Sequence, residues 1–327
     1  MPDETPHSTD PGVPRSPGRA LDALAIALFL GAIFAPLVDL AVRPAEVRSP
    51  EVELRQPAPV PSLAGQAAWV RFPEAFEDWW NDSFGLRDRL LRWHSLLKIG
   101  AFRVSPSERM VLGRDDWIFS TVERSLDVFR GLAPLTEKEL EWWRIALESR
   151  RDWCAERGIA FVYALAPSKQ AVYPERMPSS LTVTGPTRVD QLVDYLAARS
   201  DLRVLDLRES QERAKAADDP AAGDFAYYPL GTHWSVRGAY AATRALRDRI
   251  AGSLPAVGAV ELPESVRWVR DETSQGDSWA ARLYVEDVLR QTVWRADPDS
   301  LPGVELSSEE QPARRALVFE QAGVDLP

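Results

Sequence analysis

The chain is poor in cysteine and in histidine. Its 327 residues include one cysteine, Cys154, and three histidines. One cysteine cannot form an intrachain disulfide, and it rules out a zinc site of the cysteine type. Cys154 falls within a helical pattern, where a small thiol is usually inert. We therefore expect no metal site and no cofactor, and the redox compartment stays open.

Positive charge is also in short supply. Lys and Arg number 39 against 49 Asp and Glu, which gives a net charge of −10. Phosphate binding needs clustered Lys and Arg, so we do not expect nucleic acid as a partner. The apolar share of 45% and the charged share of 27% are typical of a globular protein. The length allows one large domain or two moderate ones.

The N-terminal part contains one long apolar run. Residues 1–20 are rich in Pro, Ser, Thr and charge, and we expect them to be disordered. In residues 21–42, LDALAIALFLGAIFAPLVDLAV, the stretch 23–38 carries no charge and is just short of the usual spanning length. A membrane anchor, a cleaved signal peptide and a buried core helix all fit this run. We predict a single-pass anchor, because the flanking segments argue against a core helix and no clear cleavage site follows.

A change of composition marks the start of the folded part. Residues 43–65 contain five prolines and predict an extended linker that lifts the rest of the chain off the membrane. Residues 66–327 are predicted to form the main domain. Within it, apolar spacing indicates one or two amphipathic helices over residues 76–102, and residues 110–120 indicate a hairpin.

Helices and strands then alternate. Thr136 and Glu139 form a capping box for a helix that runs to Glu156 and is ended by Gly158. Ser235 is a plausible N-cap for a later helix. Further apolar runs predict a helix over 186–198 and strands over 159–167, 202–207 and 314–320. This order favours an α/β fold with a mostly parallel sheet flanked by helices, in which ligands lie beyond the carboxyl ends of the strands.

Four separated elements resemble one family. The stretch GTHWSVRGA, which contains His233 and Trp234, is similar to the Asp-Thr-His-Trp-(x)₃-Gly-Ala element of the SGNH-hydrolase-like domain of alginate O-acetyltransferases. The other three elements occur in the family's order, and the resemblance covers roughly residues 70–325. They comprise Asp82, Phe84, Gly85 and Arg87; Gly113, Asp115, Trp117 and Phe119; and Pro167, Lys169, Tyr173, Pro174, Glu175 and Pro178.

The resemblance implies an exported protein of exopolysaccharide O-acetylation. A serine of such a domain attacks the acetyl donor, a histidine takes its proton, and an aspartate two residues before the histidine orients the imidazole. A hydroxyl depends on such a base, and the base depends on its tautomer. The implied partners are a polysaccharide and a membrane-bound acetyltransferase. The implied location is the inner membrane, single-pass through residues 21–42, with the main domain in the periplasm or outside the cell.

The sequence departs from this pattern at two positions. Gly231 stands where the family has its aspartate, and we expect Asp224 or Asp206 to be the acids that could reach the site instead. Ala322 stands where the serine is expected. The chain then stops before the helices that should close such a domain, so we expect an incomplete C-terminal end.

A second serine offers an alternative nucleophile. Gly276, Asp277 and Ser278 match the Gly-Asp-Ser element of ordinary SGNH hydrolases, although Ser278 also fits a helix N-cap or a loop position. Lys169, Tyr173 and Trp234 are predicted to line the site and bind substrate, and the alternative for Lys169 and Tyr173 is that they hold a loop in place. Three interpretations stay open. The first is an active O-acetyltransferase or acetylesterase that uses His233 with Ser278 or with another serine. The second is an inactive relative that binds polysaccharide or a membrane-bound acetyltransferase, and the third is a tethered structural protein.

Overall fold

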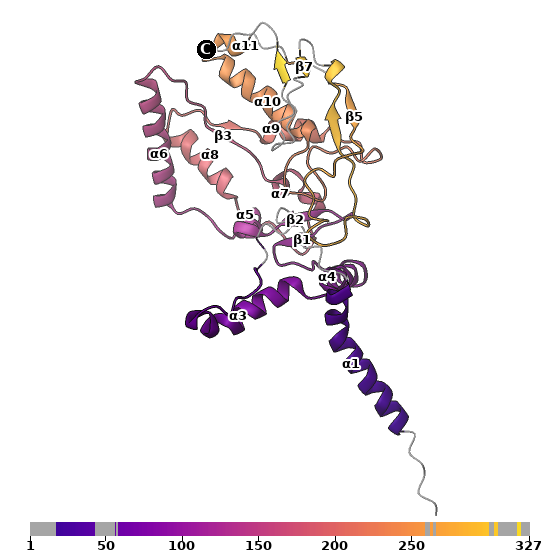
Figure 1. Cartoon of the computed structure of the whole chain (residues 1–327). Helices are drawn as coiled ribbons and strands as arrows, with labels where there is room; N and C mark the ends of the chain where they lie inside the picture. The colour runs from indigo at the N-terminus through magenta and orange to yellow at the C-terminus, as the bar shows by residue number, and fades with distance from the viewer. Residues whose placement is uncertain are drawn as a thin grey trace, which may run out of the picture. The chain divides into compact units, whose positions relative to one another are not determined.

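The computed structural model describes residues 18–42, 56, 58–258, 262–263, 266–300, 304–306 and 319–321. The chain divides into two compact units, Met1–Trp93 and His94–Pro327. Figure 1 shows the helices and strands of both. The domain boundary predicted at residue 66 stays a prediction.

The described residues form ten α-helices and eight short strands. The helices are α1 (Gly18–Val42), α3 (Gln66–Ser83), α4 (Arg87–Leu96), α5 (Ser125–Arg130), α6 (Glu137–Ala155), α7 (Lys169–Val172), α8 (Arg188–Arg199), α9 (Arg208–Lys215), α10 (Val236–Ala251) and α11 (Pro255–Gly258). The strands are β1 (Met110–Leu112), β2 (Ile118–Ser120), β3 (Ala164–Leu165), β4 (Leu205–Asp206), β5 (Trp268–Arg270), β6 (Trp294–Ala296), β7 (Val304–Leu306) and β8 (Phe319–Gln321).

The first unit contains the apolar helix α1. Its stretch Ala20–Val42 has a mean hydropathy of 2.3 and is long and apolar enough to cross a membrane, a test that a signal sequence also passes. Of residues 1–20, which were predicted to be disordered, residues 1–17 lie outside the described residues and 18–20 form the start of α1. Most of the predicted linker also lies outside the described residues. The helices expected over 76–102 are present as α3 and α4, and a π-helical turn, Leu97–Ala101, follows at the start of the second unit.

Local sequence signals in the second unit are confirmed. β1 and β2 pair antiparallel with Val111 opposite Phe119, as the hairpin prediction requires. Thr136 accepts a hydrogen bond from the backbone of Glu139, whose side chain accepts from Thr136 in return, so the capping box starts α6. Helix α6 packs on α8, and α9 packs on α10.

The strands β3 and β4 are shorter than the apolar runs 159–167 and 202–207 that contain them. Among the described residues the sheets are four two-stranded pairs, of which only β3–β4 is parallel. The run 159–167 contributes only β3, because Phe161 and Tyr163 pack against the α6–α8 cluster instead. The run 314–320 overlaps β8, which pairs antiparallel with β7. The α/β fold class is confirmed, and within the described residues the one parallel pairing is β3–β4.

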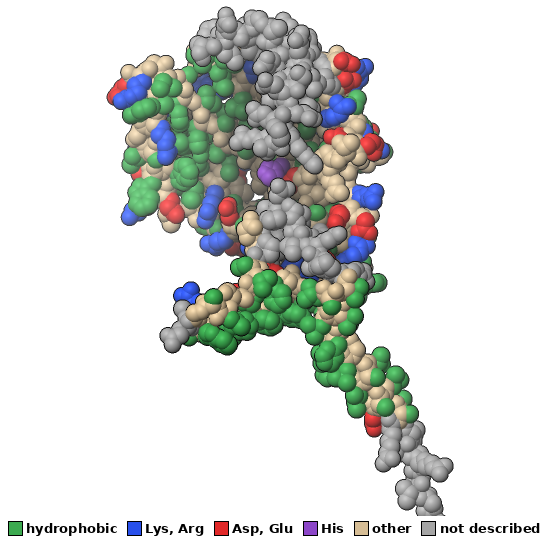
Figure 2. Space-filling view, in the orientation of Figure 1, with side chains coloured by type: hydrophobic (Ala, Val, Ile, Leu, Met, Phe, Trp, Pro, Cys, Tyr) green, Lys and Arg blue, Asp and Glu red, His purple; other side chains and the backbone are tan. Residues whose placement is uncertain are grey.

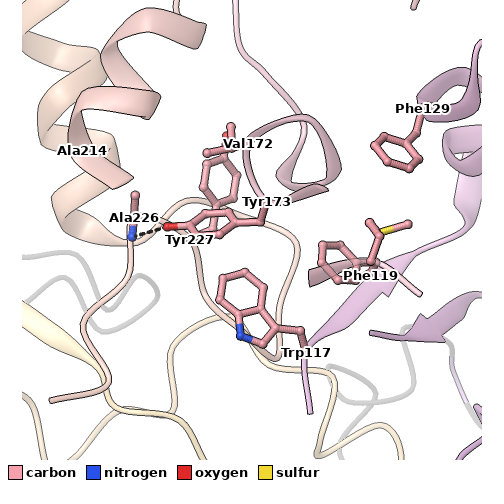
Figure 3. Close-up of a cluster of buried hydrophobic side chains, with 9 residues drawn as sticks. Trp117, Phe119, Phe129, Val172, Tyr173, Ala214, Ala226 and Tyr227 are labelled. Atoms are coloured by element: carbon pink, nitrogen blue, oxygen red, sulfur yellow. Dashed lines mark hydrogen bonds between the residues drawn. The ribbon is translucent and has the colours of Figure 1, made fainter. Parts of the chain in front are cut away.

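A buried aromatic cluster joins three separated segments. Trp117 from the hairpin, Tyr173 after α7 and Tyr227 before α10 lie together in the core (Figure 3). The ring centroids of Trp117 and Tyr173 are 4.5 Å apart. Burial of such rings stabilises a fold and fixes the backbones that carry them. The loop after Tyr227, which carries His233, is therefore anchored to the core at its base.

Candidate active site

His233 projects from a closed loop between Tyr227 and Ser235. Tyr227 and Trp234 face each other in an antiparallel bridge, and Tyr228 N–H donates to the carbonyl of His233 at 3.1 Å. Ser235 accepts from the Gly238 N–H and caps α10, as predicted. The His233 side chain is 76% exposed. A rigid loop thus presents an accessible imidazole.

Asp277 provides the carboxylate beside this imidazole. His233 Nδ1 lies 2.9 Å from Asp277 Oδ2. The same oxygen accepts from the backbone N–H of His233 at 2.8 Å and of Thr232 at 2.5 Å, and from the Thr232 hydroxyl at 3.2 Å. The carboxylate therefore fixes both the ring and the loop that carries it.

The environment keeps Asp277 ionised. Burial alone would raise the pKa of Asp277, but the hydrogen bonds from the backbone N–H groups of His233 and Thr232, and then the imidazole, outweigh it and lower the pKa. An ionised acceptor on Nδ1 selects the tautomer in which Nε2 carries the lone pair. Nε2 can then act as a base.

Gly231 leaves the space that Asp277 occupies. A Cβ on Gly231 would lie 2.2 Å from the backbone oxygen of Asp277 and 2.4 Å from its Oδ2. A side chain at position 231 and the carboxylate of Asp277 are therefore mutually exclusive in this arrangement. The expected acids lie elsewhere, because Asp224 pairs with Arg237 and Asp206 pairs with Arg208. The prediction that Asp224 or Asp206 supplies the acid is wrong.

Gln291 holds the two segments of the site together. Its side-chain oxygen accepts from the Leu230 N–H at 2.8 Å, and its amide nitrogen donates to the carbonyls of Gln275 and Asp277. The backbone N–H of Trp279 donates to the carbonyl of Leu230. Neither Asp277 as the acid nor Gln291 as its support was found from the sequence, and the only signal was the glycine at position 231.

Lys169 is buried beneath the same loop. Its side chain is 2% exposed, and Nζ donates to the carbonyl oxygens of Ile118, Tyr228, Pro229 and Gly231 at 2.6 to 2.9 Å. Burial lowers the pKa of Lys169, and Asp277 acts in the opposite sense. The contacts tie the hairpin to the His233 loop. Direct binding of substrate by Lys169 stays a prediction.

Tyr173 and Trp234 also lie at the base of the loop. The Tyr173 hydroxyl donates to Asp218 at 2.7 Å and accepts from the Ala226 N–H at 3.0 Å, and its ring is buried. Burial raises the pKa of Tyr173. Trp234 is half-buried and packs against Tyr227. Their predicted contact with substrate is not tested by these positions.

Ser278 follows Asp277 in the chain, but its hydrogen bond is to a residue other than His233. Its hydroxyl accepts from the Ala280 N–H at 3.2 Å, and within the described residues it forms no hydrogen bond with His233. Ser278 lines a largely polar hollow of about 400 Å³ together with Arg270, Asp271, Arg290 and Gln291, among others. Its role as nucleophile stays a prediction, and Ala322 lies outside the described residues.

Comparison with known families identifies the domain. The model of the family described as "SGNH hydrolase-like domain, acetyltransferase AlgX" matches residues 110–324, which is more than half of the chain. The chain belongs to this family. The match covers His233, Asp277 and Ser278, and it confirms the resemblance on which the expected fold rests. No curated protein sequence matches the chain.

Several solved structures match part of the chain. The O-acetyltransferase domain of Pseudomonas putida AlgJ is 20% identical, with a TM-score of 0.37, and the match covers 57% of this chain and 64% of that one. Bacillus cereus PatB1 is 14% identical, with a TM-score of 0.36, and the match covers 59% of each chain. A PatB1 structure with a sulfonyl adduct also matches. The chain thus spans less than two thirds of the length of these structures.

Proposed function

We propose that this domain transfers acetyl groups to hydroxyl groups of a polysaccharide, with His233 as general base and Asp277 as the residue that orients it. The observation that carries the proposal is the 2.9 Å contact between His233 Nδ1 and Asp277 Oδ2. It supplies the carboxylate that the Gly231 position lacks. Membership of an acetyltransferase family supports the reaction class.

The chemistry follows from the free lone pair on Nε2. A hydroxyl oxygen attacks the carbonyl carbon of an acetyl ester while its proton passes to Nε2 of His233. The bond from the carbonyl carbon to the leaving oxygen then breaks, and the proton moves from Nε2 to that oxygen. The imidazolium formed between these events is stabilised by the Asp277 carboxylate. His233 returns to its neutral state.

Two hydroxyls fit the attacking role. The Ser278 hydroxyl would give an acetyl-serine, which a polysaccharide hydroxyl attacks in a second round of the same steps. Alternatively, the polysaccharide hydroxyl attacks the donor directly and no covalent intermediate forms. Ser278, but not His233, lines the polar hollow, and we assign this hollow to the acceptor.

A catalytically inactive binding module is the second candidate function. The observation that favours it is the lack of a hydrogen bond between Ser278 and His233 in the described part of the chain. Such a module would bind polysaccharide, or a membrane-bound acetyltransferase that performs the transfer itself. Retention on polysaccharide without turnover would support this candidate.

Turnover of an activated acetyl ester separates these possibilities. The full chain is incubated with p-nitrophenyl acetate, and the hydrolysis rate and intact mass are compared for the unchanged chain, His233→Ala, Ser278→Ala and His94→Ala. His94 is an exposed histidine outside the site and serves as the matched control. Loss in both His233→Ala and Ser278→Ala, with an acetyl adduct, indicates the covalent route. Loss in His233→Ala alone indicates direct transfer. Rates equal to buffer in every folded sample reject catalysis.

We also propose that α1 anchors the chain in the inner membrane with the family domain outside the cytoplasm. The apolar stretch Ala20–Val42 supports this location. Alginate or a related exopolysaccharide is the acceptor that the family suggests, and a membrane-bound acetyltransferase is the partner that would supply acetyl groups. Protease digestion of spheroplasts tests the topology, because an external domain is cleaved without lysis.

A further inference from the structure

The loop between α3 and α4 rests on the C-terminal end of α1. A Cβ on Gly85 would lie 2.2 Å from the carbonyl oxygen of Pro36 and 2.7 Å from the backbone nitrogen of Leu40. Only glycine permits this approach of two backbones. The Leu86 N–H also donates to Asp39 Oδ2 at 3.1 Å. Two independent contacts thus fix this loop to the last turns of α1.

The point on α1 that the α3–α4 loop contacts determines how deep this loop would lie in a membrane. The apolar stretch Ala20–Val42 contains 23 residues. At about 1.5 Å per residue a helix of this length measures about 35 Å, slightly more than the hydrocarbon core of about 30 Å. Pro36 and Leu40 are within two turns of its end. If α1 spans a membrane, the loop that they contact lies at the boundary between hydrocarbon and headgroups.

Helix α3, which leads into this loop, has one aromatic face. At 100° per residue its five aromatic rings fall on one side of the helix and most of its charged and amide groups fall on the other. The aromatic residues are Trp69, Phe72, Phe76, Trp79 and Trp80, and the opposite face carries Arg71, Glu74, Asp78 and Asn81. Trp69 is 63% exposed and Phe76 is 42% exposed.

The aromatic residues of α3 form a continuous row. The ring centroids of Phe72 and Phe76 are 5.8 Å apart, and those of Phe76 and Trp80 are 6.2 Å apart. Figure 2 shows hydrophobic side chains along the side of α3 toward which α1 extends, and this surface continues onto α1. Trp and related amphipathic rings favour the headgroup level of a bilayer. Because this aromatic surface is continuous with α1 and is rich in Trp and Phe, we take a lipid surface as the partner that covers it.

We infer that α3 lies in the membrane interface, parallel to the bilayer, with its aromatic face in the headgroup region next to the end of α1. The inference rests on the anchoring by α1 proposed above. It gives Gly85 a role, because the glycine of the Phe-Gly element lets the loop close on α1. The Ala58 N–H also donates to Asp82 at 2.8 Å, so the chain already lies beside α3 within the predicted linker, residues 43–65. In this arrangement residues 58–93 belong to the membrane surface and are not held away from it.

Depth-dependent fluorescence quenching of the full chain tests this arrangement. Cys154 is the only cysteine, so Cys154→Ser gives a background for single labels. Leu30→Cys places an environment-sensitive dye in the middle of α1, Phe76→Cys on the aromatic face, and Asp78→Cys on the opposite face as the matched control. The labelled chains are placed in vesicles of phosphatidylethanolamine and phosphatidylglycerol that carry a nitroxide either near the headgroup or near the chain end.

The expected quenching differs at the three positions. The Leu30 label is quenched mainly by the deep nitroxide, the Phe76 label mainly by the shallow one, and the Asp78 label weakly by both. An interfacial helix buries its apolar face by about 5–10 Å, which is within reach of the shallow nitroxide. Ser83→Cys repeats the measurement on the aromatic side without removing a ring, in case the Phe76 variant fails to fold.

Each alternative result has one meaning. Quenching at Leu30 with equal, weak quenching at Phe76, Ser83 and Asp78 overturns the inference and leaves the anchor intact. No quenching at Leu30 overturns the anchoring proposal and, with it, the placement of α3. Neither outcome bears on the chemistry of His233, which the ester assay measures separately.

Discussion

Replacement of Asp277 by asparagine should reduce acetyl transfer only moderately. All four donors that meet the carboxylate reach the same oxygen, Oδ2. Two of them are the backbone N–H groups of Thr232 and His233, which the closed loop holds in place. An amide NH₂ cannot take this position, because it would face donors on every side. The amide oxygen of the substituted side chain must therefore occupy it.

The magnitude follows from what the substitution removes. Because an oxygen still accepts from His233 Nδ1, the tautomer is kept and only the negative charge is lost. Hydrogen bonds to charged groups contribute about 1.5–3 kcal/mol and neutral ones about 0.5–1.5 kcal/mol. The difference of about 1–1.5 kcal/mol corresponds to about a tenfold decrease in kcat. A wrong tautomer would cost about 10⁴, as in a serine protease whose aspartate is replaced by asparagine.

The assay combines turnover with the state of the ring. Hydrolysis of p-nitrophenyl acetate gives kcat, and nitrogen-15 NMR of the imidazole reports which ring nitrogen carries the proton. The chain has only three histidines, so a His233→Gln sample assigns the signal. A thousandfold loss with the proton on Nε2 would refute the argument that the backbone N–H groups pin the amide oxygen. An unchanged kcat in an active enzyme would show that Asp277 does not assist His233.

Three further predictions concern the supports of the site and of the fold. Gly231→Ala should lower the thermal midpoint, because overpacking reduces the free energy of unfolding by about 1–3 kcal/mol. The control Gly252→Ala should leave the midpoint unchanged, since the nearest atom to its new Cβ is 3.5 Å away. An unshifted midpoint in Gly231→Ala would contradict the close approach at that position. Lys169→Met should lower the free energy of unfolding in urea by about 3 kcal/mol or more, because several buried carbonyls lose their donor; a loss below about 1 kcal/mol would place water beside them. The pKa of Glu141 is lowered from 4.5 to about 2, mainly by the hydrogen bond from Arg144. The ionised Glu141 therefore stabilises the folded state above pH 4.5, and this stabilisation is lost as the pH falls toward 2. Glu141→Gln should remove that part of the acid dependence in thermal melts, and an identical acid profile would count against it.

The sequence correctly predicted the structural features whose interacting residues lie close together in the chain. The capping box of Thr136 and Glu139 and the Ser235 cap involve residues three positions apart, and the β1–β2 hairpin closes within eleven residues. Such contacts depend on propensity and turn chemistry, which a sequence displays directly. Strand lengths were overestimated, because an apolar run such as 159–167 can be buried against helices as well as in a sheet.

The partner of His233 could not be predicted, because it comes from 44 residues away. The Gly-Asp-Ser element suggested Ser278 as the reactive residue, whereas the structure uses its aspartate. The sequence clue to the position of the acid was Gly231. It does not lie in the left-handed region, so its backbone does not demand glycine. A glycine of that kind indicates that another group needs the space, but only the fold shows which group.

A final prediction concerns the energetic coupling between positions 231 and 277 when the carboxylate is moved from one to the other. Gly231→Asp alone should clash with Asp277, and Asp277→Gly alone should leave two backbone N–H groups and His233 without their acceptor. The double variant removes the clash with the carboxylate, but the approach of 2.2 Å to the backbone oxygen of residue 277 remains. It also returns an aspartate to the position two residues before His233. We expect its kcat to exceed that of Gly231→Asp, with an interaction energy of about 1–3 kcal/mol in the double-mutant cycle. Additive losses in the two substitutions would mean that Gly231 and Asp277 do not compete for one place, and that the acid of this site arose without displacing another.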